Sequence, residues 1–361
     1  LQGLKFKTVT DPKLLDIIVT PSQLPTVSPA VQGRIIHQAR HAALLGSLEA
    51  RIDPGAPGGK LADHLLSARI LADFYDTQMH WEIRCLEQVL ADLEGPVVLL
   101  KGAAYKALDL GLAKGRLASD VDLLLPRAQL EAAEGLLLKA GWELVKADEY
   151  DQHYYREWMH ELPPLRNGER GTIVDLHHNI LPPTGRFTPD ADKLLAAAIP
   201  IPDSAFYTLS PEDAVIHRSA HLFVDGDLHN SLRELVDLHG LLLLYQQDEG
   251  FKRALLPRAL EMELARPLYY AIYFCHKLLA WEVPVGWMEQ LENDGGIGRA
   301  FTCMLMEQQL RSTYPCEDTW RQRVAGWMLF LRSHWLRMPP GMLIKHLLGQ
   351  AWRRGGVKTG G

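Results

Sequence analysis

The chain has 361 residues, of which 47% are hydrophobic and 23% are charged, and its formal net charge at pH 7 is −6. This composition is that of a folded globular protein, and the length allows more than one packed unit. An acidic chain lacks the positive field on which general nucleic-acid binding draws, so the charge disfavours nucleic acid as a partner.

The cysteines and the apolar segments bear on the cellular compartment. The four cysteines lie far apart and form no CxxC pair, which excludes a zinc ribbon and a dithiol redox motif. Isolated thiols fit a reducing cytoplasm. The apolar stretches Val97–Leu100 and Leu241–Leu244 are far shorter than the roughly 20 residues that span a bilayer, and no signal-peptide pattern opens the chain. We therefore expect a cytoplasmic protein without a transmembrane segment.

The first part of the chain is predicted to be an arm followed by helices. Residues 1–30 are rich in Pro, Thr and Ser, and the apolar run Leu14–Val19 predicts one short helix there. Ala30–Ala50 and Ala62–Leu93 repeat apolar residues at three- and four-residue spacing, with a Pro- and Gly-rich break between them. Residues 1–94 are thus assigned to an N-terminal arm and helices.

A different pattern begins at Gly95, where short apolar segments typical of buried strands alternate with turns and short helical stretches. A helix opened by Pro126 should end at Gly141, which is a typical C-terminal capping residue. Residues 95–202 are predicted to be a mixed α/β core that ends in a Pro-rich link, Leu181–Pro202. The expected strands are Val97–Leu100, Val121–Leu125, Trp142–Val145, Tyr154–Trp158, Glu161–Leu165 and Thr172–Leu176.

Helical spacing returns after residue 202 and persists to near the end of the chain. Ser210 and Pro211 are typical of an N-cap and a first helical position. Residues 203–361 are therefore predicted to form an all-α domain, and the fold class is α+β, a small mixed-sheet core flanked by helices. The expected helices are Ala214–Phe223, Ser231–Gln246, Phe251–Leu264, Pro267–Leu279, Gly298–Leu310 and Thr319–Leu336.

The segment Ser119-Asp120-Val121-Asp122-Leu123 is the most informative for chemistry. Side chains alternate faces along a strand, so Asp120 and Asp122 should point to one face while Val121 and Leu123 enter the core. Neighbouring carboxylates repel each other unless a positive charge lies between them, and a divalent cation is the usual solution. A strand with one solvated polar face is the alternative explanation, and this motif alone does not exclude it.

Two other segments favour the cation. Upstream, an expected buried strand runs into Lys101-Gly102 at the start of a helix, where a glycine, free amides and a lysine suit an anion. Downstream, Asp175 follows Ile173 and Val174 on an expected strand, and a buried acid there needs a metal or a base as its partner.

Together these segments resemble the polymerase-β-like nucleotidyltransferase superfamily. The closest resemblance is to an uncharacterised bacterial nucleotidyltransferase family within it, whose members show similar motifs over the core. Here the motifs are Leu100-Lys101-Gly102, Arg116-Leu117-Ala118-Ser119-Asp120-Val121-Asp122-Leu123-Leu124 and Val174-Asp175-Leu176-His177. The resemblance implies a small mixed-sheet nucleotidyltransferase core flanked by N-terminal helices and a C-terminal all-α domain.

The resemblance also implies roles for these residues. Asp120, Asp122 and Asp175 would be the catalytic and metal-binding residues, holding Mg²⁺, or Mn²⁺ as the other candidate, for transfer of a nucleoside monophosphate from an NTP to an acceptor hydroxyl. Asp175 would also help to deprotonate that hydroxyl. The residues expected to bind the nucleotide are Lys101, Gly102, Arg116 and Ser119. The acceptor stays open, and so does a catalytically silent nucleotide- or metal-binding protein of the same fold that serves regulation or assembly.

His177, His221 and Arg233 are further candidates. His177 shares the strand face of Asp175, so it could contact the metal's surroundings or the acceptor, or merely pack at the strand end. His221, four residues after His217, suggests a metal-hydrolase pair extended by Asp225 and His229, but without the glutamate of an HExxH motif the signal is weak. His221 could instead line the cleft. Arg233 could reach the nucleotide, although an ion pair with Asp237, four residues later, is the favoured interpretation.

The C-terminal part of the chain contains a group of tryptophans with arginines and lysines nearby. Packing into the core is the favoured interpretation for most of them. Contact of the basic C-terminal tail with a membrane surface or a protein partner is the alternative. The tryptophans are Trp320, Trp327, Trp335 and Trp352, and the basic residues are Arg332, Arg337, Lys345, Arg353 and Arg354.

Overall fold

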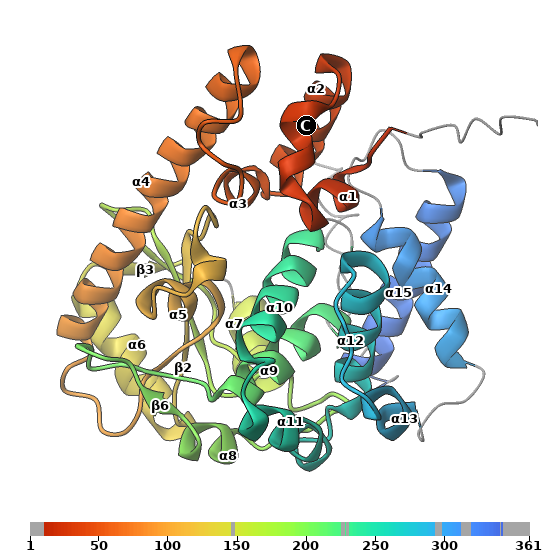
Figure 1. Cartoon of the computed structure of the whole chain (residues 1–361). Helices are drawn as coiled ribbons and strands as arrows, with labels where there is room; N and C mark the ends of the chain where they lie inside the picture. Colours follow the sequence, from red (N-terminus) through yellow and green to blue (C-terminus); the bar gives the residue numbers. More distant parts are fainter. Residues whose placement is uncertain are drawn as a thin grey trace, which may run out of the picture.

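A computed structural model of the chain describes residues 11–145, 149–224, 228, 231–292, 298–311, 319–339 and 341. In Figure 1 the N-terminal helices lie at the top, the sheet with its helices lies at the lower left, and the C-terminal helices lie at the right. The predicted order of helices, mixed α/β core and helices is confirmed for these residues. The boundaries at residues 94 and 202 stay predictions, because a single cluster of buried hydrophobic side chains includes residues from all three parts.

The N-terminal helices bury apolar faces that the sequence spacing predicts. The 31-residue helix α4 directs Leu61, Leu65 and Leu86 inward, at helical spacing. Its neighbour α3 lies against it, and α1 begins and ends at the predicted residues. The elements are α1 (Leu14–Val19), η1 (Pro21–Thr26), α2 (Pro29–His41), α3 (Leu45–Glu49) and α4 (Gly59–Val89).

The sheet within the described residues has seven strands in the order β3-β4-β5-β2-β1-β7-β6. The central pair β2 and β5 is parallel, as is the pair β1 and β7, and the other pairs are antiparallel. The sheet is therefore mixed, as predicted. The strands are β1 (Val98–Leu99), β2 (Asp120–Leu124), β3 (Trp142–Leu144), β4 (Leu165–Asn167), β5 (Ile173–His177), β6 (Ile199–Pro200) and β7 (Tyr207–Thr208).

Short helices connect the strands and cover the sheet. Helix α5 follows β1 and contacts β2, while α6 contacts β5. Gly141 follows α6 with a φ of 86°, so it ends that helix as predicted. These elements are α5 (Lys101–Ala107), η2 (Gly111–Ala113), η3 (Arg127–Gln129), α6 (Leu130–Lys139), α7 (Glu149–Trp158) and α8 (Ala191–Ala196).

Two predictions for the core are wrong. Tyr154–Trp158 belongs to helix α7 rather than to a strand, and the rings of Tyr154 and Trp158 pack edge to face at a four-residue helical spacing. The segment Glu161–Leu165 forms only an isolated bridge from Glu161 to His177, and the next strand begins at Leu165. The region described as a Pro-rich link also contains α8 and the edge strand β6, which are too short to show a clear hydrophobic period.

The C-terminal helices pack against one another and against the sheet-bearing part. Helix α9 contacts α10, α11 and α12. The Ser210 hydroxyl accepts a hydrogen bond from the Asp213 amide at 3.2 Å, so Ser210 caps α9 as predicted. The helices are α9 (Pro211–Val224), α10 (Leu232–Tyr245), α11 (Glu249–Glu261), α12 (Ala265–Leu279), α13 (Trp287–Glu292), α14 (Gly298–Leu310) and α15 (Trp320–Arg337).

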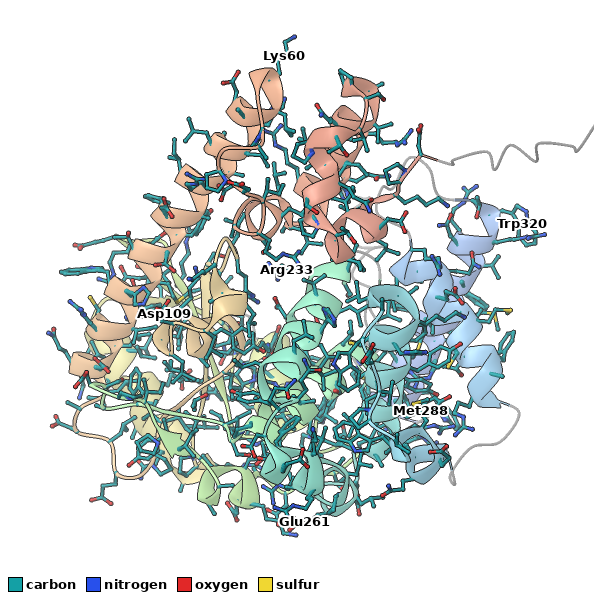
Figure 2. All side chains as sticks on the ribbon, in the orientation of Figure 1. Lys60, Asp109, Arg233, Glu261, Met288 and Trp320 are labelled. Carbon is teal, nitrogen blue, oxygen red and sulfur yellow. The ribbon has the colours of Figure 1, made fainter. Side chains whose placement is uncertain are left out.

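The expectation that the late tryptophans pack in the core is wrong for three of them. Trp320, Trp327 and Trp335 on α15 are 65%, 63% and 48% exposed, and Figure 2 shows Trp320 on the outside of the molecule. Trp352 and the basic tail lie outside the described residues. In the described part of the chain, no helix combines the length and the apolar character that a membrane crossing requires.

The turn at Gly115 joins the sheet-bearing part to the N-terminal helices through a close backbone approach. Gly115 has a φ of 72°, and a Cβ there would collide with the carbonyl of Gly46 in α3. We expect Gly115→Ala to lower the free energy of unfolding by about 1–3 kcal/mol, since it adds a steric clash to a left-handed backbone conformation. Chemical denaturation measures this change. Gly111→Ala is the control, because a Cβ at Gly111 meets no atom within 4 Å, and equal stability of the two variants would contradict the prediction.

Candidate active site

The two central parallel strands bring Asp122 and Asp175 side by side. Their register pairs Asp122 directly with Asp175, and side chains at paired positions of neighbouring strands project from the same face of a sheet. Asp120 lies two residues before Asp122 and so shares that face, exposed at the start of β2 next to the exposed Ser119. Val121 and Leu123 are fully buried, as the alternation predicts. The strand pairing therefore brings the three predicted acids to one region of the sheet.

Asp175 is a half-buried acid with one unpartnered oxygen. Its Oδ1 is sealed from solvent and accepts no hydrogen bond from the described residues. Burial, and then the negative charges of Asp122 and Glu161, raise the pKa of Asp175 to about 7, with a further contribution from Asp120. The ionised form of such a carboxyl group is destabilised, and a cation bound next to it would stabilise that form.

Asp122 differs from Asp175 because a lysine ammonium and an imidazole meet one of its oxygens. Its Oδ1 accepts hydrogen bonds from Lys101 Nζ at 2.9 Å and from His177 Nε2 at 3.0 Å. Burial alone would raise the pKa of Asp122, but the Lys101 ammonium and the His177 imidazole hold it well below its usual range. Asp122 is therefore an ionised, buried carboxylate whose Oδ2 accepts no hydrogen bond from the described residues.

Lys101 is the first residue of α5, two positions after the end of β1. Its φ is 48°, a left-handed conformation that costs a non-glycine residue about 1 kcal/mol or more. Burial by itself would lower the pKa of Lys101, but the Asp122 carboxylate raises it overall, so the ammonium is charged. Next to it, a Cβ on Gly102 would collide with the Arg116 guanidinium. The glycine thus makes room for an arginine, a requirement that the sequence analysis did not identify.

Arg116 belongs to a buried ion network that joins the segment before β2 to two helices. Its Nε donates to Asp237 Oδ2 of α10 at 3.0 Å, and Arg218 Nη2 of α9 donates to the same oxygen at 2.9 Å. All three side chains are buried. This placement favours a structural role for Arg116, whereas contact with a nucleotide phosphate stays a prediction.

The favoured ion pair between Arg233 and Asp237 is wrong. Asp237 accepts its hydrogen bonds from Arg116 and Arg218, while Arg233 Nη1 donates to the carbonyl of Leu117 at 3.3 Å. The physical reason is that Asp237 faces the protein interior, where two other guanidinium groups reach it. Figure 2 shows Arg233 at the end of α10 that lies nearest the N-terminal helices.

The histidines of α9 have separate roles in the structure. His221 Nδ1 lies 3.0 Å from Glu234 Oε2 of α10. His217 is buried, and burial together with the charge of Lys101 lowers its pKa well below the usual value. Among the described residues these two histidines belong to no cluster of three metal-ligating side chains. Asp225 and His229, the other members of the predicted hydrolase site, lie outside the described residues.

The sequence did not indicate two functional candidates near Asp175, namely His160 and Glu161. His160 and Glu161 precede β4, and the bridge between Glu161 and His177 brings them to the end of β5. Glu161 Oε2 lies 3.4 Å from His177 Nδ1. The sequence signal was weak, because a His-Glu pair in an irregular segment shows no periodicity that would connect it with a distant strand.

The arrangement as a whole combines acidic and basic groups around one strand pair. Asp120, Asp122 and Asp175 supply carboxylate oxygens, which are the ligands that Mg²⁺ prefers. Lys101 supplies a positive charge next to Asp122, and the His177 imidazole donates a second hydrogen bond to the same carboxylate oxygen. Such a site can hold a divalent cation and polarise phosphate oxygens near it.

Comparison with known proteins agrees with this chemistry. Residues 28–280 match the family described as an uncharacterised nucleotidyltransferase, and this match includes every predicted motif and the helices α9 and α10. No curated protein and no solved structure shows a match to the chain. Because the matched region is more than half of the sequence, the chain belongs to this uncharacterised nucleotidyltransferase family.

Proposed function

We propose that the protein transfers a nucleoside monophosphate from an NTP to an acceptor hydroxyl in a reaction that depends on Mg²⁺ or Mn²⁺, as in the polymerase-β-like superfamily. The observation that carries the proposal is the register of Asp122 with Asp175, together with the unpartnered Oδ1 of Asp175. Buried acidic oxygens without a counter-charge are costly, and a divalent cation removes that cost.

The chemistry of these residues fits a divalent cation, and each residue would have its own role. Asp120, Asp122 and Asp175 would hold the metal, which when bound supplies positive charge to the phosphate oxygens. Asp122 Oδ2 and Asp175 Oδ1 are among the oxygens of these acids that accept no hydrogen bond from the described residues. Lys101 and His177 orient Asp122 through its other oxygen.

The transfer step balances without a further reactant. The acceptor oxygen forms a bond to the α-phosphorus, the bond from that phosphorus to the bridging oxygen breaks, and pyrophosphate leaves. The proton of the acceptor hydroxyl passes to the Asp175 carboxylate, whose pKa of about 7 suits a base near neutral pH.

One observation favours a second candidate, a catalytically silent nucleotide- or metal-binding module that serves regulation or assembly. Asp122 Oδ1 already has the Lys101 ammonium and the His177 imidazole as partners, so part of the negative charge of the site is neutralised by the protein itself. A site of this kind could retain a nucleotide without transferring it.

Labelled nucleotides separate the two candidates. The full chain is incubated with Mg²⁺, each of the four NTPs and fractionated cell extract as the source of acceptors. The proposal predicts that an α-phosphate label enters a product while a γ-phosphate label leaves as pyrophosphate. NTP binding without any labelled product would support the silent module, and no binding of any NTP would contradict both.

Lys101→Met tests whether the ammonium serves the nucleotide. This change keeps the side-chain length but removes a charge that lies 2.9 Å from Asp122. If Lys101 also contacts phosphate, we expect the KM for the NTP to rise about 10-fold, which corresponds to about 1.4 kcal/mol. Steady-state kinetics over a range of NTP concentrations measures this. An unchanged KM would assign Lys101 to the orientation of Asp122 alone.

A further inference from the structure

We infer that His160, Glu161 and His177 form a site for a divalent transition-metal ion of the zinc class, separate from the three aspartates. Ligand atoms of these three side chains all lie within 4.8 Å of one another. His160 and His177 are buried and Glu161 is half-buried. The inference does not depend on nucleotidyl transfer, because it rests on a different set of side chains.

The spacing of the ligand atoms suits a tetrahedral ion. Two ligand atoms that are each about 2.1 Å from such an ion lie about 3.4 Å apart. His177 Nδ1 and Glu161 Oε2 are separated by 3.4 Å. The imidazole of His160 lies against that of His177, with ring centroids 5.4 Å apart. A ligand nitrogen of His160 lies within 4.8 Å of the ligand atoms of both other side chains.

His177 has the hydrogen-bond arrangement that metal-ligating histidines usually show. Its Nε2 lies 3.0 Å from Asp122 Oδ1, and its Nδ1 faces Glu161. When one ring nitrogen donates to a carboxylate, the other presents its lone pair, and such a carboxylate fixes the ring and increases its basicity toward a metal. Asp122 would then orient His177 as a ligand while Lys101 balances its charge.

His160 supplies an independent observation. Its side chain is 7% exposed. Its Nδ1 is sealed from solvent, and neither Nδ1 nor Nε2 makes a hydrogen bond with the described part of the chain. A buried imidazole that satisfies neither nitrogen is costly unless a ligand completes it. A metal ion bound between the three side chains would provide that partner.

The donor set selects the class of metal. Two imidazole nitrogens and one carboxylate oxygen suit zinc and similar first-row ions, whereas Mg²⁺ prefers oxygen ligands. Three protein ligands would leave a fourth position for water or a substrate atom. The ion would also tie the segment that contains His160 and Glu161 to the end of β5, next to Asp175.

Cobalt titration tests the site directly. Untagged full-length protein is freed of metal with a chelator and titrated with Co²⁺ in excess Mg²⁺, which occupies the aspartate site. We expect one equivalent of Co²⁺ to produce visible absorption bands of low-coordinate cobalt and Zn²⁺ to displace it. His160→Gln and Glu161→Gln should each weaken Co²⁺ binding by about 100-fold or more, since even partners outside the ligand set contribute about 10–100-fold.

His178→Gln is the matched control. His178 neighbours His177 but bonds to the carbonyl of Met159 at 3.2 Å and belongs to no ligand group. This variant should bind Co²⁺ as tightly as the original protein. If His160→Gln does not fold, the half-buried Glu161→Gln gives the result. Absence of cobalt bands in the unaltered protein, or equal affinity in Glu161→Gln, would overturn the inference, and neither result would affect the assay with labelled NTPs.

Discussion

Asp175→Asn is expected to lower the rate of nucleotidyl transfer on the order of 10³-fold, because a metal-binding carboxylate contributes several kcal/mol to such a reaction. Asparagine preserves the shape of the side chain but removes the negative charge and the ability to take the proton of the acceptor hydroxyl. The initial rate of α-label incorporation, measured at saturating NTP and Mg²⁺, gives the change.

The same substitution should leave the fold intact. Asp175 is surrounded by other negative charges and has an oxygen without a partner. Its replacement therefore removes electrostatic repulsion in the metal-free protein, and we expect the unfolding temperature to stay equal or to rise. Glu143→Gln is the control, since Glu143 is an exposed acid on β3 of the same sheet. A rate for Asp175→Asn similar to that of Glu143→Gln would exclude Asp175 from the reaction.

Asp237→Ala should destabilise the protein by about 3–5 kcal/mol, which is the usual effect of removing one partner from a buried ion network. The change leaves the guanidinium groups of Arg116 and Arg218 buried without their shared carboxylate. The repulsion between these two guanidinium groups would then weaken the packing of the segment before β2 against α9 and α10. The free energy of unfolding in urea or guanidinium chloride measures the loss.

An exposed ion pair supplies the comparison for Asp237. Glu249 is 73% exposed in its pair with Lys252, so Glu249→Ala should change stability by less than about 1 kcal/mol. If Asp237→Ala is too unstable to purify, Asp237→Asn keeps the shape and should show a smaller loss. A change of less than about 1 kcal/mol in Asp237→Ala would mean that the network does not hold these elements together.

The three aspartates could be predicted from the sequence because the signals for them are local and periodic. Asp120 and Asp122 alternate with buried residues on one strand, and Asp175 lies between apolar residues on another. Their convergence followed from the resemblance to a known order of strands. The structure adds the register that places Asp175 beside Asp122.

The ion networks could not be predicted, because they join residues that are distant in the sequence. Arg116 and Asp237 are separated by 121 positions, and nothing in the helix spacing of α10 indicates that Asp237 faces inward toward the sheet. Helical spacing suggested Arg233 as its partner. In the folded protein Asp237 pairs with Arg218 instead, because a buried ion pair stabilises the Asp237 carboxylate more strongly than an i, i+4 pair on the helix surface.

Short elements account for most of the errors in the fold. Strands β6 and β7 contain two residues each, which is too few for an alternating pattern to appear. Residues 154–158 were predicted as a strand but belong to α7. Its aromatic residues Tyr154 and Trp158 instead use the i, i+4 spacing of a helix face.

Nucleotide binding by calorimetry tests the central claim most directly, because it requires no acceptor. The titrant is an NTP analogue with a methylene group between the α- and β-phosphorus atoms, added to the full chain with Mg²⁺ or with EDTA. The account predicts binding with Mg²⁺, no binding with EDTA, and loss of binding when Asp122→Asn and Asp175→Asn are combined. Equal binding with and without metal, or unchanged Mg²⁺-dependent binding by the double variant, would contradict the assignment of these aspartates to the metal site.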